Sequence, residues 1–292
     1  MMTLKMLTAM ITPYNPDLQV NYDRAGEIAD YLVNNGSDGI VVSGTTGESP
    51  VLSSTEKVQL FAAVKARVGD RTEVWAGTGS YDTQASIRLS REAEKVGVDG
   101  LLLVTPYYNK PSQEGLYQHF KAIAESVSIP IMLYNIPGRT GINMLPETVA
   151  RLAEIENIAA LKESSGMMDQ MSVLKNILPE KMAIFSGDDS LTLPMLALGA
   201  AGVVSIASHL VGKEIKQMLD AFAAGDVKRA QELHNHLFPM FKGLFITTNP
   251  VPVKEALNIL GMNVGGLRPP MCSANDDEVS KLKKLLASYH LV

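Results

Sequence analysis

The segment Ile158-Ala159-Ala160-Leu161-Lys162-Glu163-Ser164-Ser165-Gly166 joins a short apolar run to an abrupt polar turn. An apolar run of this length, bounded by turn residues, is typical of a buried β-strand. Seven similar runs occur elsewhere, and each run but the last is followed by an amphipathic stretch before the next begins. The predicted strands are residues 7–11, 39–42, 74–77, 101–104, 131–134, 158–162, 183–186 and 203–206.

Eight consecutive βα units predict an α/β protein, a closed (β/α)8 TIM barrel. The last predicted strand leads into a helix near residues 213–222, and the strands stop after about residue 225. The remainder indicates helices near residues 226–245, 251–260 and 275–288. We therefore expect a catalytic barrel over residues 1–225 and a C-terminal helical domain, a small appendage, over residues 226–292.

Turn and capping signals separate the predicted elements. Pairs of glycines three residues apart recur between a helix and a strand, the first suited to a left-handed helix end and the second to a crowded strand start. These pairs are Gly36 and Gly39, Gly97 and Gly100, and Gly199 and Gly202. Ser53-Ser54-Thr55-Glu56 resembles a capping box, and Pro146-Glu147 suits a first helical turn.

The composition narrows the range of functions. Hydrophobic residues make up 46% and charged residues 20%, a globular balance that argues against disorder. A net charge of -5 gives no basic field for nucleic acid. The single cysteine, Cys272, excludes an intrachain disulfide, and the first apolar stretch is too short for a membrane span or a signal sequence. We expect a cytoplasmic protein that acts on small metabolites.

Two predicted strands end in groups suited to imine chemistry. Lys162 ends the sixth run, and Tyr134 ends the fifth. An unprotonated lysine attacks a ketone, and the resulting imine acidifies the adjacent carbon without any metal, while a tyrosine can act as acid and base. The alternatives are that Lys162 extends to the surface and that Tyr134 only packs at the barrel mouth.

Two further segments are suited to binding carboxylates. The glycine-flanked turn at residues 44–49, which contains Thr45 and Thr46, offers backbone amides and hydroxyls to a small carboxylate. Arg139 stands in a Pro-Gly-Arg-Thr-Gly turn and can donate two parallel hydrogen bonds to a second carboxylate. The alternatives are that the threonines cap a turn and that Arg139 is a solvent-exposed turn residue.

Metal chemistry is the competing hypothesis. None of the five histidines has the spacing of metal ligands, and His234 and His236 point to different faces of one predicted helix. Asp188 and Asp189 could bind a divalent ion, although an aspartate that opens a helix is commonly a cap. We therefore expect no metal site.

Taken together, these motifs resemble the dihydrodipicolinate synthase family over essentially the whole chain. The matching segments are Gly44-Thr45-Thr46-Gly47-Glu48, Thr105-Pro106-Tyr107-Tyr108-Asn109-Lys110-Pro111-Ser112, Tyr134-Asn135-Ile136-Pro137-Gly138-Arg139-Thr140-Gly141, Leu161-Lys162-Glu163, Ser186-Gly187-Asp188-Asp189 and Asn249-Pro250-Val251-Pro252-Val253-Lys254. The resemblance implies condensation of pyruvate with L-aspartate 4-semialdehyde, the committed step toward diaminopimelate and lysine. It also implies a homotetramer, a dimer of tight dimers.

The resemblance also implies a role for each matching residue. Lys162 aligns with the lysine that forms the Schiff base, so no cofactor beyond this covalent imine is expected. Tyr134, Thr45 and Tyr108 align with a proton relay, in which the residue aligned with Tyr108 enters from a neighbouring subunit. The residues expected to surround the substrates are Thr46 with Thr45 at the pyruvate carboxylate, Arg139 at the semialdehyde carboxylate, and the backbone of Gly187 and Val204.

The wider family leaves two alternatives open. Aldolases that cleave keto sugar acids, such as N-acetylneuraminate lyase, share the lysine, the tyrosine and the glycine-rich loop. They generally lack an arginine at the position of Arg139, so this residue favours the synthases. The non-enzymatic alternative is a metabolite-binding barrel without turnover, which the presence of both Lys162 and Tyr134 argues against.

The resemblance departs from the family at the pocket between subunits where lysine inhibits some members. Those members place histidines and an acidic group there. The aligned positions in this chain are Ser54, Lys57, Tyr81 and Ala85, with Ser49 and Tyr107 also at the pocket. A cationic Lys57 and the missing carboxylate disfavour the ammonium group of the effector.

We therefore predict little or no feedback inhibition of this enzyme by L-lysine. Steady-state rates at saturating substrate should stay unchanged as L-lysine is raised through the micromolar range. Strong inhibition at micromolar L-lysine would refute this prediction.

Overall fold

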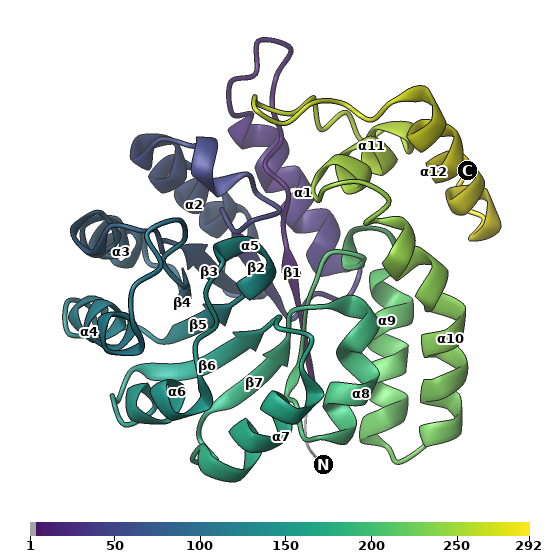
Figure 1. Cartoon of the computed structure of the whole chain (residues 1–292). Coiled ribbons are helices and arrows are strands. Elements are labelled where there is room, and N and C mark those ends of the chain that lie inside the picture. Colours follow the sequence, from purple (N-terminus) through teal and green to yellow (C-terminus); the bar gives the residue numbers. More distant parts are fainter. Residues whose placement is uncertain (1–3) are drawn as a thin grey trace.

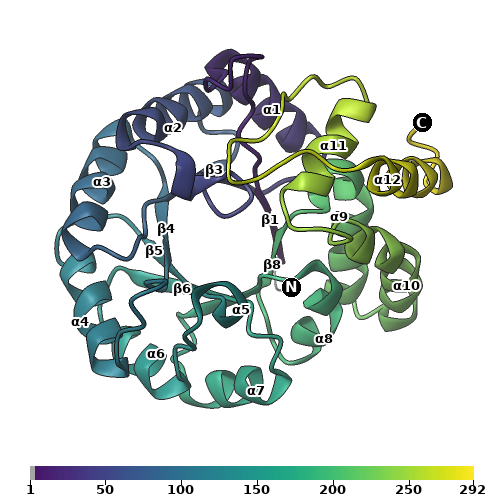
Figure 2. The ribbon, with the colours of Figure 1, turned by 45° about the horizontal axis from the view of Figure 1, so that its top comes forward.

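The computed structural model describes residues 4–292 and shows a closed barrel of eight parallel strands in chain order. The strands are β1 (Lys5–Ala9), β2 (Gly39–Val42), β3 (Glu73–Gly77), β4 (Gly100–Val104), β5 (Ile131–Asn135), β6 (Ile158–Glu163), β7 (Ala183–Ser186) and β8 (Gly202–Ser205). Helices surround the strands in a ring, seen along the barrel in Figure 2. The predicted TIM barrel is confirmed; residues 1–3 of the predicted barrel segment lie outside the described residues.

Helices alternate with the strands along the chain and most lie in the outer ring, whereas the short α5 (Pro137–Thr140) lies inside the ring, over the barrel opening in Figure 2. They are α1 (Tyr22–Asn34), α2 (Ser54–Val68), α3 (Thr83–Val96), α4 (Gln113–Ala124), α5 (Pro137–Thr140), α6 (Pro146–Leu152), α7 (Met168–Ile177), α8 (Thr192–Ala197) and α9 (Ser208–Ala223). The C-terminal helices are α10 (Val227–Gly243), α11 (Val251–Ile259) and α12 (Asp276–Ser288). In Figure 1, α10 runs alongside α9, and the loop after α11 passes near the top of α1, whereas α12 packs against α10 and α11. None of the helices in residues 4–292 is long and apolar enough to cross a membrane.

Side-chain alternation along each strand divides the apolar residues into two layers. In β4, Leu101 and Leu103 pack outward in the large cluster between sheet and helices, whereas Leu102 points into the barrel. The inner cluster is Leu7, Ala9, Val41, Trp75, Leu102, Met132, Tyr134, Ala160, Phe185 and Val204. The barrel interior is therefore packed with side chains, and any cavity for a small molecule is expected at one of its ends.

The predicted glycine pairs behave as the pattern indicated. Gly36, Gly97 and Gly199 have φ values of 95°, 86° and 91°, in the left-handed region. At the strand starts, a Cβ on Gly100 would lie 2.6 Å from the Trp75 ring, and one on Gly202 would lie 1.9 Å from the Lys5 carbonyl oxygen. The second glycine of each of these two pairs therefore leaves room for its neighbour.

The first strand differs from its predicted range, since β1 is Lys5–Ala9 rather than residues 7–11. The strand begins early because Lys5 pairs with Gly202 of β8. It ends early because the amide of Ile11 donates to His209 Nε2, at 3.2 Å, instead of to a neighbouring strand. The apolar character of residues 10 and 11 reflects burial beyond the strand end. The capping box at Ser53 and Glu56 and the helix start at Pro146 are confirmed.

His209 is fully buried, and both of its ring nitrogens are used. Nδ1 lies 2.8 Å from the Ile206 carbonyl oxygen, and Nε2 accepts from the Ile11 amide. This arrangement corresponds to a neutral ring that donates from Nδ1. Burial lowers the pKa of His209 from 6.5 to about 4, against the opposing effect of its hydrogen bond to Ile206.

We predict that His209 makes the folded state less stable in acid. As the pH falls from 6.5 toward 4, the unfolded chain binds a proton at this ring that the folded chain excludes, so the free energy of unfolding decreases. The measurement is the free energy of unfolding in urea at a series of pH values from about 7.5 to about 4.5. His209→Gln should show a smaller decrease than the native chain, whereas the exposed control His236→Gln should not; equal slopes for all three would contradict the assignment.

Candidate active site

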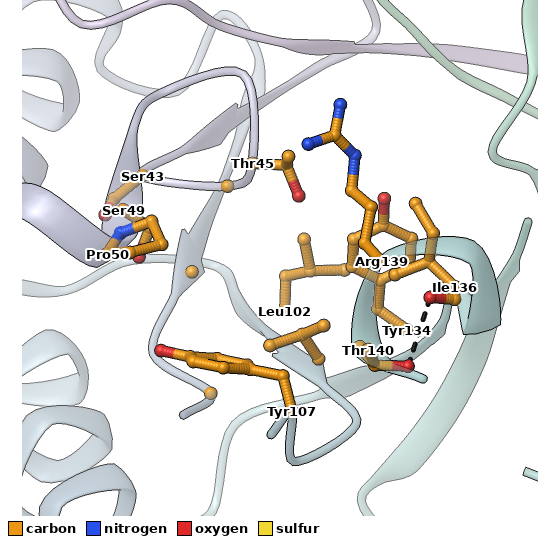
Figure 3. Close-up of a pocket in the computed structure, with 14 residues that line it drawn as sticks. Ser43, Thr45, Ser49, Pro50, Leu102, Tyr107, Tyr134, Ile136, Arg139 and Thr140 are labelled. Carbon is orange, nitrogen blue, oxygen red and sulfur yellow. Dashed lines mark hydrogen bonds between the residues drawn. The ribbon is translucent and has the colours of Figure 1, made fainter. Parts of the chain in front are cut away.

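A cavity of about 250 Å³ opens at the C-terminal ends of the barrel strands. Figure 3 shows its wall, which includes strand ends, the turn after β2 and the turn after β5. The lining residues are Ser43, Gly44, Thr45, Ser49, Pro50, Gly77, Gly79, Leu102, Val104, Tyr107, Tyr134, Ile136, Arg139 and Thr140. Among the predicted catalytic and substrate-binding residues, it therefore contains Thr45, Tyr134 and Arg139.

Lys162 and Tyr134 are neighbours on adjacent strands of the barrel. They stand opposite each other in the register of β5 and β6, and both are buried, with exposed fractions of 5% and 4%. The amine nitrogen of Lys162 lies 4.2 Å from the centroid of the Tyr134 ring. Tyr134 lines the cavity and Lys162 does not, so the amine lies beside the ring of a lining phenol, away from bulk water.

Gly187 leaves the space that the Lys162 side chain occupies. Its amide donates to the Glu163 carbonyl oxygen at 2.9 Å, which ties the end of β7 to β6. A Cβ at this position would lie 1.8 Å from Ser164 Oγ and 2.9 Å from Lys162 Cε. Any other residue would have to displace the Ser164 hydroxyl first and would also crowd the Lys162 side chain. Val204 on β8 is buried in the inner barrel cluster that also contains Tyr134.

The turn after β2 carries Thr45 and Thr46, which face different surroundings. Its own backbone closes it, because the Glu48 amide donates to the Thr45 carbonyl and the Ser49 amide to the Gly44 carbonyl. Thr45 lines the cavity, whereas Thr46 is buried and its hydroxyl oxygen accepts from Asn249 Nδ2 at 3.0 Å. The turn thus faces the cavity on one side and the C-terminal segment on the other.

Arg139 lies on the short helix α5, immediately after β5. One guanidinium nitrogen donates to the Asn249 carbonyl oxygen at 3.3 Å, and the rest of the side chain is exposed at the cavity. A guanidinium with unused donors at the edge of a cavity is suited to bind a carboxylate. Asn249 thus contacts both Thr46 and Arg139, through its side chain and its backbone respectively.

Two adjacent tyrosines after β4 have different surroundings. Tyr107 lines the cavity, and its ring meets the Tyr81 ring edge-on with centroids 5.3 Å apart. Tyr108 does not line the cavity; it is 92% exposed and has a φ of 72°, in the left-handed region. Within one chain, Tyr108 is therefore not brought together with Lys162 and Tyr134.

The residues aligned with the effector pocket are spread over several places in the single chain. Ser49 and Tyr107 line the active-site cavity, whereas Ser54 and Ala85 line a separate depression between α2 and α3. Tyr81 is exposed. Lys57 is half-buried on α2, where burial lowers its pKa from 10.5 to about 8.

The two aspartates that were weighed as metal ligands have structural contacts. Asp188 caps the short helix that follows β7 by accepting from the Ser190 amide at 2.8 Å. Asp189 is buried and accepts from the amides of Ile206 and Ala207, both at 3.0 Å, which ties the short helix after β7 to the residues after β8. Within residues 4–292, no group of three or more His, Cys, Asp and Glu side chains is arranged to hold a metal ion.

Sequence reasoning did not assign a role to several residues of this region. Ser43 lines the cavity, and a Cβ on Gly77 would lie 2.2 Å from the Ser43 carbonyl oxygen. Glu48, two residues after Thr46, forms a buried ion pair with Lys254. Glu48 and Lys254 both stood in motifs noted above, but 206 residues separate them, and no local spacing rule connects them.

Comparisons with known proteins agree with this geometry. Residues 2–289 match the model of the dihydrodipicolinate synthetase family. The chain is 60% identical to a 4-hydroxy-tetrahydrodipicolinate synthase of Desulforamulus reducens, covering 99% of this chain and 98% of that one. A second such relative, from Heliobacterium modesticaldum, is 58% identical, covering 98% and 96%.

Solved structures show the same likeness. A dihydrodipicolinate synthase from Bacillus anthracis, 47% identical, superimposes with a TM-score of 0.96 and covers 98% of both chains. A structure of the enzyme from Cyanidioschyzon merolae with lysine bound, 42% identical, gives a TM-score of 0.97 and covers 100% of this chain and 99% of that one. By family model, sequence identity and fold, the chain belongs to the dihydrodipicolinate synthetase family.

Proposed function

We propose that the chain acts as a 4-hydroxy-tetrahydrodipicolinate synthase, a lyase that condenses pyruvate with L-aspartate 4-semialdehyde in the diaminopimelate route to lysine. Relatives with this name, up to 60% identical over nearly the whole chain, support the activity. The observation that carries it is the buried Lys162 amine, 4.2 Å from the Tyr134 ring, beside a cavity that Thr45 and Arg139 also line.

In the proposed reaction, the unprotonated amine of Lys162 attacks the keto carbon of pyruvate. Loss of water from that adduct gives an imine, which draws electrons from the adjacent methyl group and allows it to lose a proton. The resulting enamine carbon attacks the aldehyde carbon of the semialdehyde and forms the new C–C bond. The amino group of the semialdehyde then attacks the imine carbon, closes the ring and releases Lys162. The covalent imine is the only electron sink in this proposal.

The proton steps are proposed for Tyr134, Thr45 and Tyr108. Tyr134 is adjacent to the amine and lines the cavity, so its hydroxyl is suited to deliver and remove protons as water leaves the adduct. Thr45 lines the same cavity and can pass a proton between hydroxyls. The third member, Tyr108, is exposed in a single chain and would need to come from another copy.

Two carboxylate receptors would orient the substrates. The backbone amides and hydroxyls at Thr45 and Thr46 would hold the pyruvate carboxylate near Lys162, with the backbone of Gly187 and Val204 alongside. Arg139 would hold the carboxylate of the semialdehyde. An aldolase for keto sugar acids would need polyol contacts at that position, so the guanidinium favours the synthase.

Self-association is the remaining part of the proposal. We infer that Tyr108 of a second copy completes each active site in a tight dimer, and that two dimers form a homotetramer. Tyr108 supports this because it is 92% exposed, with a left-handed backbone, and directly follows Tyr107, which lines the cavity. One solved relative, 36% identical with a TM-score of 0.96, is described as the first monomeric dihydrodipicolinate synthase variant.

The first test uses Arg139→Ala to distinguish binding of the semialdehyde from formation of the imine at Lys162. In a coupled assay, kcat/KM for the semialdehyde should fall by roughly 10- to 100-fold, as for a lost hydrogen bond to a charged group. Borohydride trapping of pyruvate on Lys162 should stay as in the native chain. Arg151→Ala, an exposed arginine paired with Glu114, is the matched control. Full activity of Arg139→Ala would overturn the acceptor assignment, and an unlabelled Lys162 would overturn the proposed function.

The second test asks whether Tyr108 acts in a neighbouring copy. Tyr108→Phe and Lys162→Ala should each be nearly inactive alone, since loss of a proton-transfer group costs at least about 100-fold. Mixed after dissociation, they should regain up to about a quarter of native activity, because a mixed dimer has one site with both native residues. Tyr134→Phe mixed with Lys162→Ala is the control and should regain nothing. No recovery in the first mixture would show that Tyr108 does not act in a neighbouring copy.

A further inference from the structure

Glu48 and Lys254 form a buried ion pair directly behind the turn that carries Thr45 and Thr46. The amine nitrogen of Lys254 lies 2.9 Å from Glu48 Oε1, and each side chain is 2% exposed. The same amine donates to the Thr12 carbonyl oxygen at 2.9 Å and lies 4.2 Å from the centroid of the Tyr14 ring. Lys254 thus connects α11 both to Thr12, in the segment that follows β1, and to the turn after β2.

The turn is fixed at this point by further contacts. The Thr12 hydroxyl donates to the Gly47 carbonyl oxygen at 2.7 Å, one residue before Glu48. Glu48 itself has a φ of 55°, in the left-handed region that costs energy for a residue with a side chain. The backbone therefore holds this conformation because the surrounding contacts stabilise it.

The second carboxylate oxygen of Glu48 has its own donor. The backbone amide of Arg268 donates to Glu48 Oε2 at 3.0 Å, and the Arg268 guanidinium binds Glu56 and the Val51 carbonyl oxygen. The chain on both sides of α11 thus reaches the same turn. A carboxylate with partners at both oxygens has little freedom to move.

We propose that Glu48 and Lys254 are positioning residues that hold the backbone amides of Thr45 and Thr46 in place for the pyruvate carboxylate. This inference rests on the proposed function, in which those amides bind pyruvate. It makes α11 a working part of the active site, although the strands alone carry Lys162 and Tyr134. Neither Glu48 nor Lys254 touches the reacting atoms.

The physical reason is the sensitivity of amide donors to small displacements. The turn has no strand partner of its own, and its amides are useful only if they point at one place. Removing one member of a buried pair leaves the other charge without its partner, so the turn would shift or admit water. The expected effect is weaker pyruvate binding with the chemistry at Lys162 retained.

The test measures how borohydride trapping on Lys162 depends on pyruvate concentration, with no second substrate present. Glu48→Gln and Lys254→Met should each raise the half-saturating pyruvate concentration by about tenfold or more, while the trapping rate at saturation stays within about threefold. The double variant should show no larger shift than the more affected single variant, because the two residues act as one unit. Thr12→Val loses the hydrogen bond to the Gly47 carbonyl and should also raise the half-saturating pyruvate concentration. It replaces Lys254→Met in the test if that variant does not fold.

The matched control is Lys216→Met at the opposite end of the barrel. Lys216 also donates to a carboxylate and a backbone carbonyl, Asp38 at 3.0 Å and Leu4 at 3.2 Å, so its loss tests stability alone. It should lower the Tm without moving the half-saturation. Folded Glu48→Gln and Thr12→Val with half-saturation within about twofold of native would overturn this inference alone, as would additive shifts in the double variant. A native chain that pyruvate does not label would overturn the proposed function as well.

Discussion

The parallel hydrogen-bond register of the closed barrel is the constraint on which the site depends. Because all eight strands run the same way, their C-terminal ends form one rim, and polar residues that are far apart in the chain meet there. The pairing of Tyr134 with Lys162 in adjacent strands sets the distance between phenol and amine. A shift of one residue in either strand would turn one of the two side chains to the outer face.

The two buried lysines at the rim have different surroundings, and the difference matches different roles. Lys254 has a carboxylate and a carbonyl oxygen within hydrogen-bond distance. Lys162 has the face of an aromatic ring. Breaking a buried ion pair costs about 3–5 kcal/mol, so Lys254 is held where it lies. An amine that must become covalently attached to a substrate requires a position from which it can react.

The contacts of the C-terminal segment bear on the expected division at residue 225. Asn249, Lys254 and Arg268 all reach the turn after β2, which lies about 200 residues earlier in the chain. Asn249 also contacts Arg139, so the two proposed carboxylate receptors share one neighbour. In the proposed mechanism the barrel supplies the reacting groups, and the segment beyond it holds the receptor for the first substrate.

The sequence by itself determined the order of strands and helices, the barrel and the residues at its strand ends. Alternating apolar runs, the left-handed glycines and the capping box are local signals, and they were sufficient for this. The predicted end of β1 was wrong by two residues because the amide of Ile11 donates to His209, which is far away in the chain. Only the tertiary structure decided the pairing of Glu48 with Lys254, the role of Asn249 and the exposure of Tyr108. These depend on contacts across about 200 residues or on the shape of the whole surface, which no local spacing encodes.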